Sequence, residues 1–158
     1  MKGTDFDELA FFRAIGSSGA RALLIGRRAL VVLGLPVLTA DYDFWLHIDD
    51  IESFNEAARR FDLYPSVDAS AARQRGRYVL ENDERVDVLV ARSAPTVDGL
   101  AVTFDELWAT RELEPLAEGV SVALPRVAGL ILTKRFAARP KDIEDIRLLE
   151  VLRQERER

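Results

Sequence analysis

Two short segments alternate acidic with apolar side chains, and this alternation constrains the fold more than any other feature of the chain. Residues 41–45 carry carboxylates at Asp41 and Asp43, and residues 85–90 carry Asp87 among valines. Successive side chains of a β-strand point to opposite faces, so Asp41 and Asp43 are predicted to share one face. On the second segment the valines mark a core face, which leaves the aspartate on the opposite face.

The remaining pattern mixes further strands with helices. The predicted strands cover residues 22–25, 42–48, 77–81, 85–91 and 120–124. The predicted helices run from Thr4 to about Gly16, over 28–33, from Asp49 or Asp50 to about Phe61, over 103–109 and 127–138, and from Pro140 with a buried stripe at Leu148, Leu149 and Leu152. Because these elements mix without strict βαβ alternation, the predicted fold class is α+β.

The length of 158 residues fits a single domain over 1–158. We expect its core at about 20–125 and a C-terminal helical segment at about 126–154. Hydrophobic residues make up 48% of the chain, enough for a core of normal size. The absence of cysteine excludes disulfides, thiolate metal sites and a cysteine nucleophile.

The terminal and overall charge patterns bear on location and partners. No apolar run approaches the length of a membrane span, and the acidic N-terminus does not resemble a signal peptide, so we expect a cytoplasmic protein with no membrane partner. The formal net charge of −5 argues against broad nonspecific binding to nucleic-acid backbones. With 22 Lys and Arg residues, the chain still has enough cations for a local basic groove.

The three aspartates are candidate metal ligands. Two ionised carboxylates on one strand face repel each other, and a divalent cation relieves that repulsion. Oxygen ligands suit Mg²⁺ or Mn²⁺. Asp87 lies on a strand that looks well buried, where an unpaired charge is expensive, so a cation shared with Asp41 and Asp43 would supply its partner. Three such carboxylates can hold two cations for in-line displacement at phosphorus.

Gly26 is the third part of the pattern. It follows the short apolar strand 22–25 and is expected to open a helix. Such a turn lets backbone N–H groups approach a phosphate. Each part also has a structural interpretation: an Asp-x-Asp pair occurs often at solvated strand edges, and glycine at a turn often serves the backbone alone. If the carboxylates only tie the sheet together, Asp43→Asn lowers stability, whereas a metal site predicts unchanged or higher stability without metal.

Taken together, the motifs resemble a known superfamily. Residues 24–26 (Leu-Ile-Gly), a short helix to Gly34, and residues 39–45 (Thr-Ala-Asp-Tyr-Asp-Phe-Trp) are similar to the core motif of the nucleotidyltransferase-like superfamily, which includes DNA polymerase β. Residues 130–134 and 139–145 resemble the superfamily's Lys-helix and its Arg-Pro-Lys-Asp-x-x-Asp segment. The closest resemblance is to small bacterial nucleotidyltransferases of the abortive-infection toxin type. It implies a mixed β-sheet of about four to five strands flanked by helices, with C-terminal helices.

The resemblance also implies residue roles. Asp41, Asp43 and Asp87 would be catalytic and bind Mg²⁺ or Mn²⁺, with Asp87 helping to activate the attacking group. The nucleotide-binding residues would be Gly26, Arg27, Thr39 and Lys134, of which Thr39 would orient the Asp-bearing strand and Lys134 would approach the triphosphate or steady the site. The implied reaction moves a nucleoside monophosphate from an NTP to a hydroxyl of an RNA, protein or small-molecule acceptor. The toxin-type resemblance adds a cognate antitoxin or other partner protein.

Two positions differ from the family's pattern. Arg27 follows Gly26 where glycine or serine is usual, and Val37 stands where relatives often carry arginine. A guanidinium at position 27 could bind phosphate. Either change could instead mark lost activity, which motivates a second hypothesis: a catalytically degenerate module of the same fold that binds a nucleotide or a protein partner.

Other residues have competing interpretations. Trp45 shares the face of Asp41 and Asp43 and is predicted to be a core residue rather than a base-stacking one. His47, the only histidine, is expected at the surface rather than as a ligand. The arginines around Gly76 form either a solvated hairpin edge or an electropositive rim: Arg73, Arg75 and Arg77.

Two blocks late in the chain have structural alternatives to a site role. Lys134, in an apolar helix, could be a surface side chain that snorkels. Asp142 and Asp145 near a helix start favour the helix dipole. Our preferred detail is a salt-bridged Asp142 that holds the last helix.

Overall fold

The computed structural model describes residues 6–91, 94–95, 101–135 and 139–157. The helices are α1 (Glu8–Ser17), α2 (Gly26–Val32), η1 (Ile48–Asp50, a 3₁₀ turn), α3 (Ile51–Arg59), α4 (Ala69–Arg75), α5 (Phe104–Ala109), α6 (Val127–Lys134) and α7 (Pro140–Arg156). The strands are β1 (Ala22–Ile25), β2 (Asp41–Leu46), β3 (Tyr64–Pro65), β4 (Arg77–Glu81), β5 (Arg85–Val90), β6 (Ala94–Pro95), β7 (Ala101–Val102), β8 (Glu112–Ala117) and β9 (Val120–Leu124).

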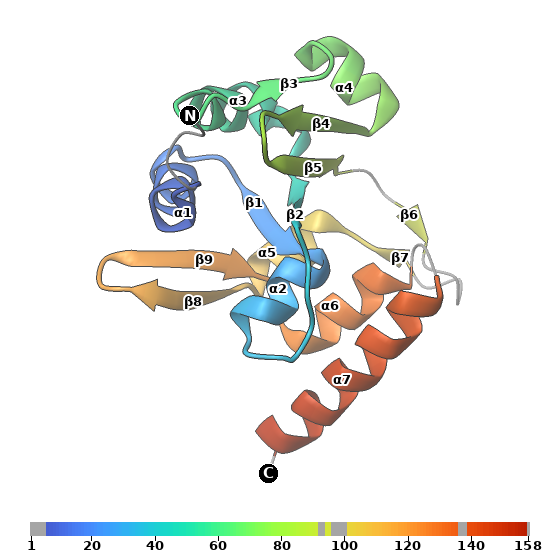
Figure 1. The fold of residues 1–158 in the computed structure, drawn as a ribbon. Coiled ribbons are helices and arrows are strands. Elements are labelled where there is room, and N and C mark those ends of the chain that lie inside the picture. The colour runs from blue at the N-terminus through green and yellow to red at the C-terminus, as the bar shows by residue number, and fades with distance from the viewer. Residues whose placement is uncertain (1–5, 92–93, 96–100, 136–138, 158) are drawn as a thin grey trace.

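A five-stranded mixed sheet lies at the centre of the molecule (Figure 1). Its strand order is β1-β2-β5-β4-β3, and only the β2–β5 pair is parallel. The predicted α+β class with about four to five mixed strands is therefore confirmed. The parallel pair matters most for the site, because its register places Asp43 directly beside Asp87 and Asp41 beside Arg85.

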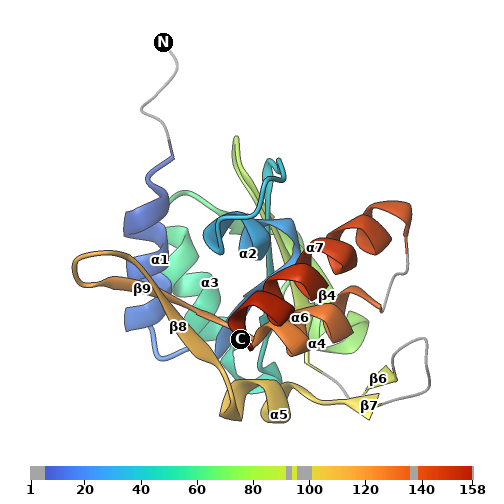
Figure 2. The same ribbon diagram turned by 90° about the horizontal axis from the view of Figure 1, so that it is seen from below.

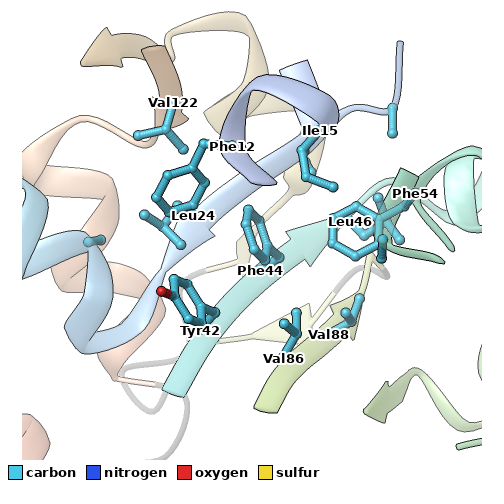
Figure 3. Close-up of a cluster of buried hydrophobic side chains, with 14 of the residues drawn as sticks. Phe12, Ile15, Leu24, Tyr42, Phe44, Leu46, Phe54, Val86, Val88 and Val122 are labelled. Atoms are coloured by element: carbon cyan, nitrogen blue, oxygen red, sulfur yellow. The ribbon is translucent and has the colours of Figure 1, made fainter. Parts of the chain in front are cut away.

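One face of the sheet packs against α1 and α3, which lie on the opposite side of the central strands from α6 and α7 (Figure 2). Alternate side chains of β2 and β5 point into this core, as the two strand patterns predict. Figure 3 shows them beneath side chains of α1 and α3. The buried members of the two strands are Tyr42, Phe44, Leu46, Val86, Val88 and Val90.

The other face of the sheet is divided. At one end, Leu23 and Trp45 pack with Phe104 and Leu107 of α5 in a second apolar cluster. Trp45 is 1% exposed, with the Phe104 ring edge-on at 5.6 Å, so its predicted core role is confirmed. Towards the other end this face carries Asp41, Asp43 and Asp87, of which Asp41 is exposed and the other two are half-buried.

Several predicted boundaries were wrong. The second helix begins at Gly26, not residue 28, and the strand predicted over 42–48 ends at Leu46. The Asp50 carboxylate makes no cap to α3, because it accepts two bonds from the Arg21 guanidinium at 2.8 and 3.0 Å. The helix predicted to reach residue 138 ends at Lys134, and 136–138 lie outside the described residues.

The ends of the chain show similar differences. Helix α1 is capped by Asp7, whose carboxylate accepts a hydrogen bond from the Ala10 N–H at 3.0 Å; the predicted cap, Thr4, lies outside the described residues. Of the stripe predicted for the last helix, only Leu149 is fully buried. Six elements were not predicted: α4, η1, β3, β6, β7 and β8. Within the described part of the chain, no helix is long and apolar enough to cross a membrane.

Candidate active site

A single cleft of about 850 Å³ gathers the residues singled out by the sequence motifs. It is bordered by the β1–α2 turn, the segment before β2, the open face of β2 and β5, and the ends of α6 and α7. All seven predicted site residues line it: Gly26, Arg27, Thr39, Asp41, Asp43, Asp87 and Lys134. Segments separated by more than a hundred residues in sequence therefore meet at one place.

The surroundings of Asp43 in the cleft disfavour the ionised form of its carboxylate. It is half-buried and accepts no hydrogen bond from any described residue. Its pKa is raised to about 6, first by burial and then by the neighbouring charges of Asp87 and Asp41; Lys134 and Lys141 offset part of that rise. A carboxylate in this setting lacks a counter-ion.

Gly26 lies in direct contact with Asp43. Its φ of +68° falls in the left-handed region, and a Cβ placed there would stand 2.5 Å from the Asp43 Oδ2. Glycine is therefore required twice, by the backbone turn and by the carboxylate packed over it. The turn was predicted to admit a phosphate; its contact with Asp43 was not predicted.

Asp87 is paired within its own strand. The Arg85 guanidinium donates to both carboxylate oxygens, with Nε 3.3 Å from Oδ1 and 3.2 Å from Oδ2 and a terminal nitrogen 3.1 Å from Oδ1. In the described part of the chain, no three acidic, histidine or cysteine side chains gather closely enough to form a ready-made metal site. Arg85 was missed as a site residue, although its spacing of two from Asp87 on a strand could have identified it.

Asp41 is held from its backbone. The Thr39 hydroxyl accepts a hydrogen bond from the Asp41 N–H at 3.2 Å. The Arg28 side chain donates to the carbonyls of both residues at 3.3 Å and lies 4.1 Å over the Tyr42 ring. Arg28 was also missed, because no local pattern marks contacts to a segment eleven residues away.

Lys134 is neither at the surface nor free. Its side chain is 6% exposed, and its Nζ lies 3.0 Å from the Asp145 Oδ2 and 3.7 Å from the Asp142 Oδ1. The snorkelling alternative is therefore wrong. Asp145 is fully buried and also accepts from the Arg27 Nε at 3.1 Å, while its second oxygen has no hydrogen-bond partner.

Arg27 consequently faces the last helix as well as the cleft. Besides Asp145, its guanidinium donates to the Leu38 carbonyl at 3.4 Å. The side chain that departs from the family pattern thus links the β1–α2 turn to α7 rather than standing free over the turn. Val37 packs half-buried against the main core.

The start of α7 is closed by a reciprocal cap. Asp142, 2% exposed, accepts from the Arg139 backbone N–H at 3.1 Å and from its Nε at 2.9 Å. Burial alone would raise the pKa of Asp142, but the hydrogen bonds from Arg139 outweigh it and lower that pKa. The predicted salt bridge of Asp142 is confirmed; its role in holding the last helix stays a prediction.

The remaining candidates are divided between surface and cleft. Arg73 and Arg75 belong to α4, so the predicted hairpin edge is wrong for them; only Arg77, on β4, lines the cleft. His47 lies just after β2, outside the cleft, and its Nδ1 accepts from the Asp49 N–H at 3.1 Å, which caps η1.

Cations outnumber acids around the cleft. The basic residues that line it are Arg27, Arg77, Arg85, Lys134, Arg139 and Lys141; the acidic ones are Asp41, Asp43, Asp87 and Asp142. Arg77 and Lys141 are exposed and form no ion pair or hydrogen bond with the described residues. The cleft can therefore attract an anion despite the acidic net charge of the chain.

Comparisons with known proteins agree with this architecture. No family model and no curated sequence matches the chain. Among solved structures, the antibiotic-resistance factor ANT(2'')-Ia superposes with a TM-score of 0.62 at 16% identity, covering 89% of this chain and 78% of that one. A candidate nucleotidyltransferase from Thermotoga maritima superposes with a TM-score of 0.51 at 16% identity, covering 94% and 89%. The chain has the nucleotidyltransferase fold.

Proposed function

We propose that this protein is a metal-dependent nucleotidyltransferase that moves a nucleoside monophosphate from an NTP to an acceptor hydroxyl. The observation that carries the proposal is the convergence of seven motif residues on one cleft, with Asp43 and Asp87 side by side on parallel strands. The fold shared with the candidate nucleotidyltransferase from Thermotoga maritima supports the reaction class.

The donor chemistry suits a divalent cation, although the three carboxylates do not form a ready-made site among the described residues. Three carboxylates share one sheet face, and Asp43 among them is half-buried and without a hydrogen-bond donor in the described chain. Asp41, Asp43 and Asp87 would hold Mg²⁺ or Mn²⁺, for which carboxylate oxygens are suitable ligands. The cation would stabilise charge on the transferred phosphoryl group and polarise the attacking hydroxyl.

The protein's own groups have distinct proposed roles. Gly26 lets the backbone of the turn approach the phosphates, and Lys141, exposed and unpaired among the described residues, offers them a cation. Asp87 accepts the proton of the acceptor hydroxyl as its oxygen bonds to the α-phosphorus. The bond from that phosphorus to the β-phosphate oxygen breaks, and pyrophosphate leaves. Lys134 steadies the cleft through its ion pairs with the buried carboxylates of Asp142 and Asp145.

The acceptor is proposed as a class: an RNA, a protein side chain or a small molecule. The toxin role and its antitoxin partner follow from the sequence resemblance to abortive-infection toxins and stay predictions. So do the cytoplasmic location and the assignment of 1–158 to a single domain.

Transfer of label tests the proposal directly. The protein is incubated with Mg²⁺ or Mn²⁺, each α-labelled NTP, and total RNA, protein extract or small hydroxyl compounds. We expect label on one acceptor class with the wild type and with Asp83→Asn, an exposed turn acid outside the cleft, and none with Asp41→Ala/Asp43→Ala.

The second candidate function has its own signature. In a degenerate module, the Arg27–Asp145 link would hold the turn in place for binding alone. Saturable NTP binding without transfer to any acceptor would favour that module. If the protein shows no NTP binding and no transfer of label, both candidate functions are contradicted.

A further inference from the structure

Arg85 and Asp87 form a closed pair on the open face of the sheet. They are two residues apart on β5, so their side chains leave the strand on the same side. Both oxygens of Asp87 accept hydrogen bonds from the guanidinium, at 3.1 to 3.3 Å. The oxygens that a cation would need are therefore already bonded.

The register of the sheet places this guanidinium in an acidic environment. Arg85 stands opposite Asp41 across the β2–β5 pair, two positions before the Asp43–Asp87 pair and on the same face of the sheet. Among the described residues it is the only side chain whose charged group bonds to any of the three carboxylates. It thus neutralises part of the charge that a divalent cation would neutralise.

The Arg85–Asp87 ion pair is in a position to separate. The two side chains are 49% and 34% exposed, and ion pairs between exposed groups are weak. The carboxylate of Glu81, across the β4–β5 hairpin, lies 3.8 Å from the guanidinium and remains available to it after Asp87 is released. By contrast, the Lys134–Asp145 pair is almost fully buried, with side chains 6% and 0% exposed.

We propose that Arg85 is a built-in counter-ion that occupies Asp87 when no divalent cation is bound and moves towards Glu81 when one binds. The proposal rests on the proposed metal site and adds its regulation: Arg85 lowers the affinity of the site for the cation. Occupation of the site then depends on conditions that loosen the pair, such as a bound polyphosphate that attracts the guanidinium.

Binding of Mn²⁺ alone tests this, with free Mn²⁺ measured by electron paramagnetic resonance. Arg85→Gln removes the cation, and we expect about tenfold tighter binding. Arg85→Lys keeps the charge but loses the two-pronged contact, and we expect about threefold tighter binding. Arg77→Gln is the matched control, because it removes a charge from the same cleft without touching Asp87; we expect less than a twofold change.

The outcomes separate the counter-ion from a general electrostatic effect. Equal tightening by Arg85→Gln and Arg77→Gln, or unchanged affinity in both Arg85 variants, would overturn the proposal while leaving the metal site intact. If wild type and Arg85→Gln both bind no more Mn²⁺ than Asp43→Asn does, the metal site and the counter-ion are overturned together. In the wild type, the Arg85 Nε–H resonance should shift on adding Mg²⁺ without NTP; a resonance that stays fixed while Mg²⁺ binds contradicts the release.

Discussion

Two groups of charged side chains lie along the same cleft, and they differ in how their charges are balanced. The helix group, carried mainly by α6 and α7, is buried: Lys134, Asp142 and Asp145 are 7%, 2% and 0% exposed and are paired with one another or with Arg27 and Arg139. The sheet group of Asp41, Asp43 and Asp87 is more exposed, and only Asp87 has a bonded cation among the described residues.

The difference separates structure from binding. Removing one partner of a buried ion pair leaves an uncompensated charge and destabilises the fold, so the helix group holds α7 in place. Like charges that lack counter-ions favour any ligand that supplies one, so the sheet group is ready for a cation. The following experiments test that contrast, from the largest expected effect to the smallest.

Asp145→Asn should break the helix group. It leaves Lys134 buried with only the more distant Asp142, and we expect a loss of about 3 kcal/mol in the free energy of unfolding, measured by urea denaturation. The double variant Lys134→Met/Asp145→Leu removes both charges and should recover most of that loss. If the single variant is as stable as wild type, the helix group does not hold α7.

Gly26→Ala tests the contact between the turn and the sheet group. The left-handed backbone and the clash with Asp43 together should cost about 2 kcal/mol or more. Gly34→Ala is a close control, because Gly34 has a φ of +85° but no atom within 4 Å of its added Cβ. An equal loss in both variants would show that the Asp43 contact contributes nothing.

Asp43→Asn should stabilise the metal-free protein above pH 6. The native pKa of about 6 exceeds the ordinary 3.8, so ionising this carboxylate weakens the fold as pH rises through that window. The shift limits the gain to about 3 kcal/mol, and we expect about 1 kcal/mol because the amide keeps charged neighbours. The gain should shrink as pH falls from 6 towards 4. A loss of stability at pH 7, with Asp83→Asn unchanged, would mean that the carboxylates tie the sheet together.

Lys141→Gln should leave stability within about 0.5 kcal/mol of wild type, because the side chain is exposed and belongs to neither paired group. Its effect should appear in binding, as a weaker affinity for Mg²⁺–NTP measured by calorimetry. Unchanged affinity would remove Lys141 from the proposed phosphate contacts.

The sequence was informative where local chemistry decides the structure. Alternation in residues 41–46 and 85–90 follows from the strand geometry, and it correctly separates core side chains from the carboxylates. The turn at Gly26 was recognisable because a short apolar strand stops there. The fold class and the candidate residues of the cleft followed from these local patterns and from the resemblance of the motifs.

The contacts between distant segments were not predictable in the same way. Arg27 meets Asp145 across 118 positions, and Arg21 takes the Asp50 carboxylate that was expected to cap α3. A side chain with several possible partners is assigned by the tertiary fold, and no spacing rule records that choice. The same reason explains why β8, a largely exposed strand that pairs only with β9 among the described elements, escaped prediction.

The packing of Asp43 over Gly26 has a consequence for how proteins of this kind can diverge. Substitutions at positions 26 and 43 are not independent of each other, because any side chain gained at the turn would occupy the space of the Asp43 carboxylate. A lineage that replaces this glycine should therefore already have shortened or lost the aspartate, and with it the site. The pair of positions then serves as a mark of ancestry, which separates descendants that kept the chemistry from those that kept only the shape.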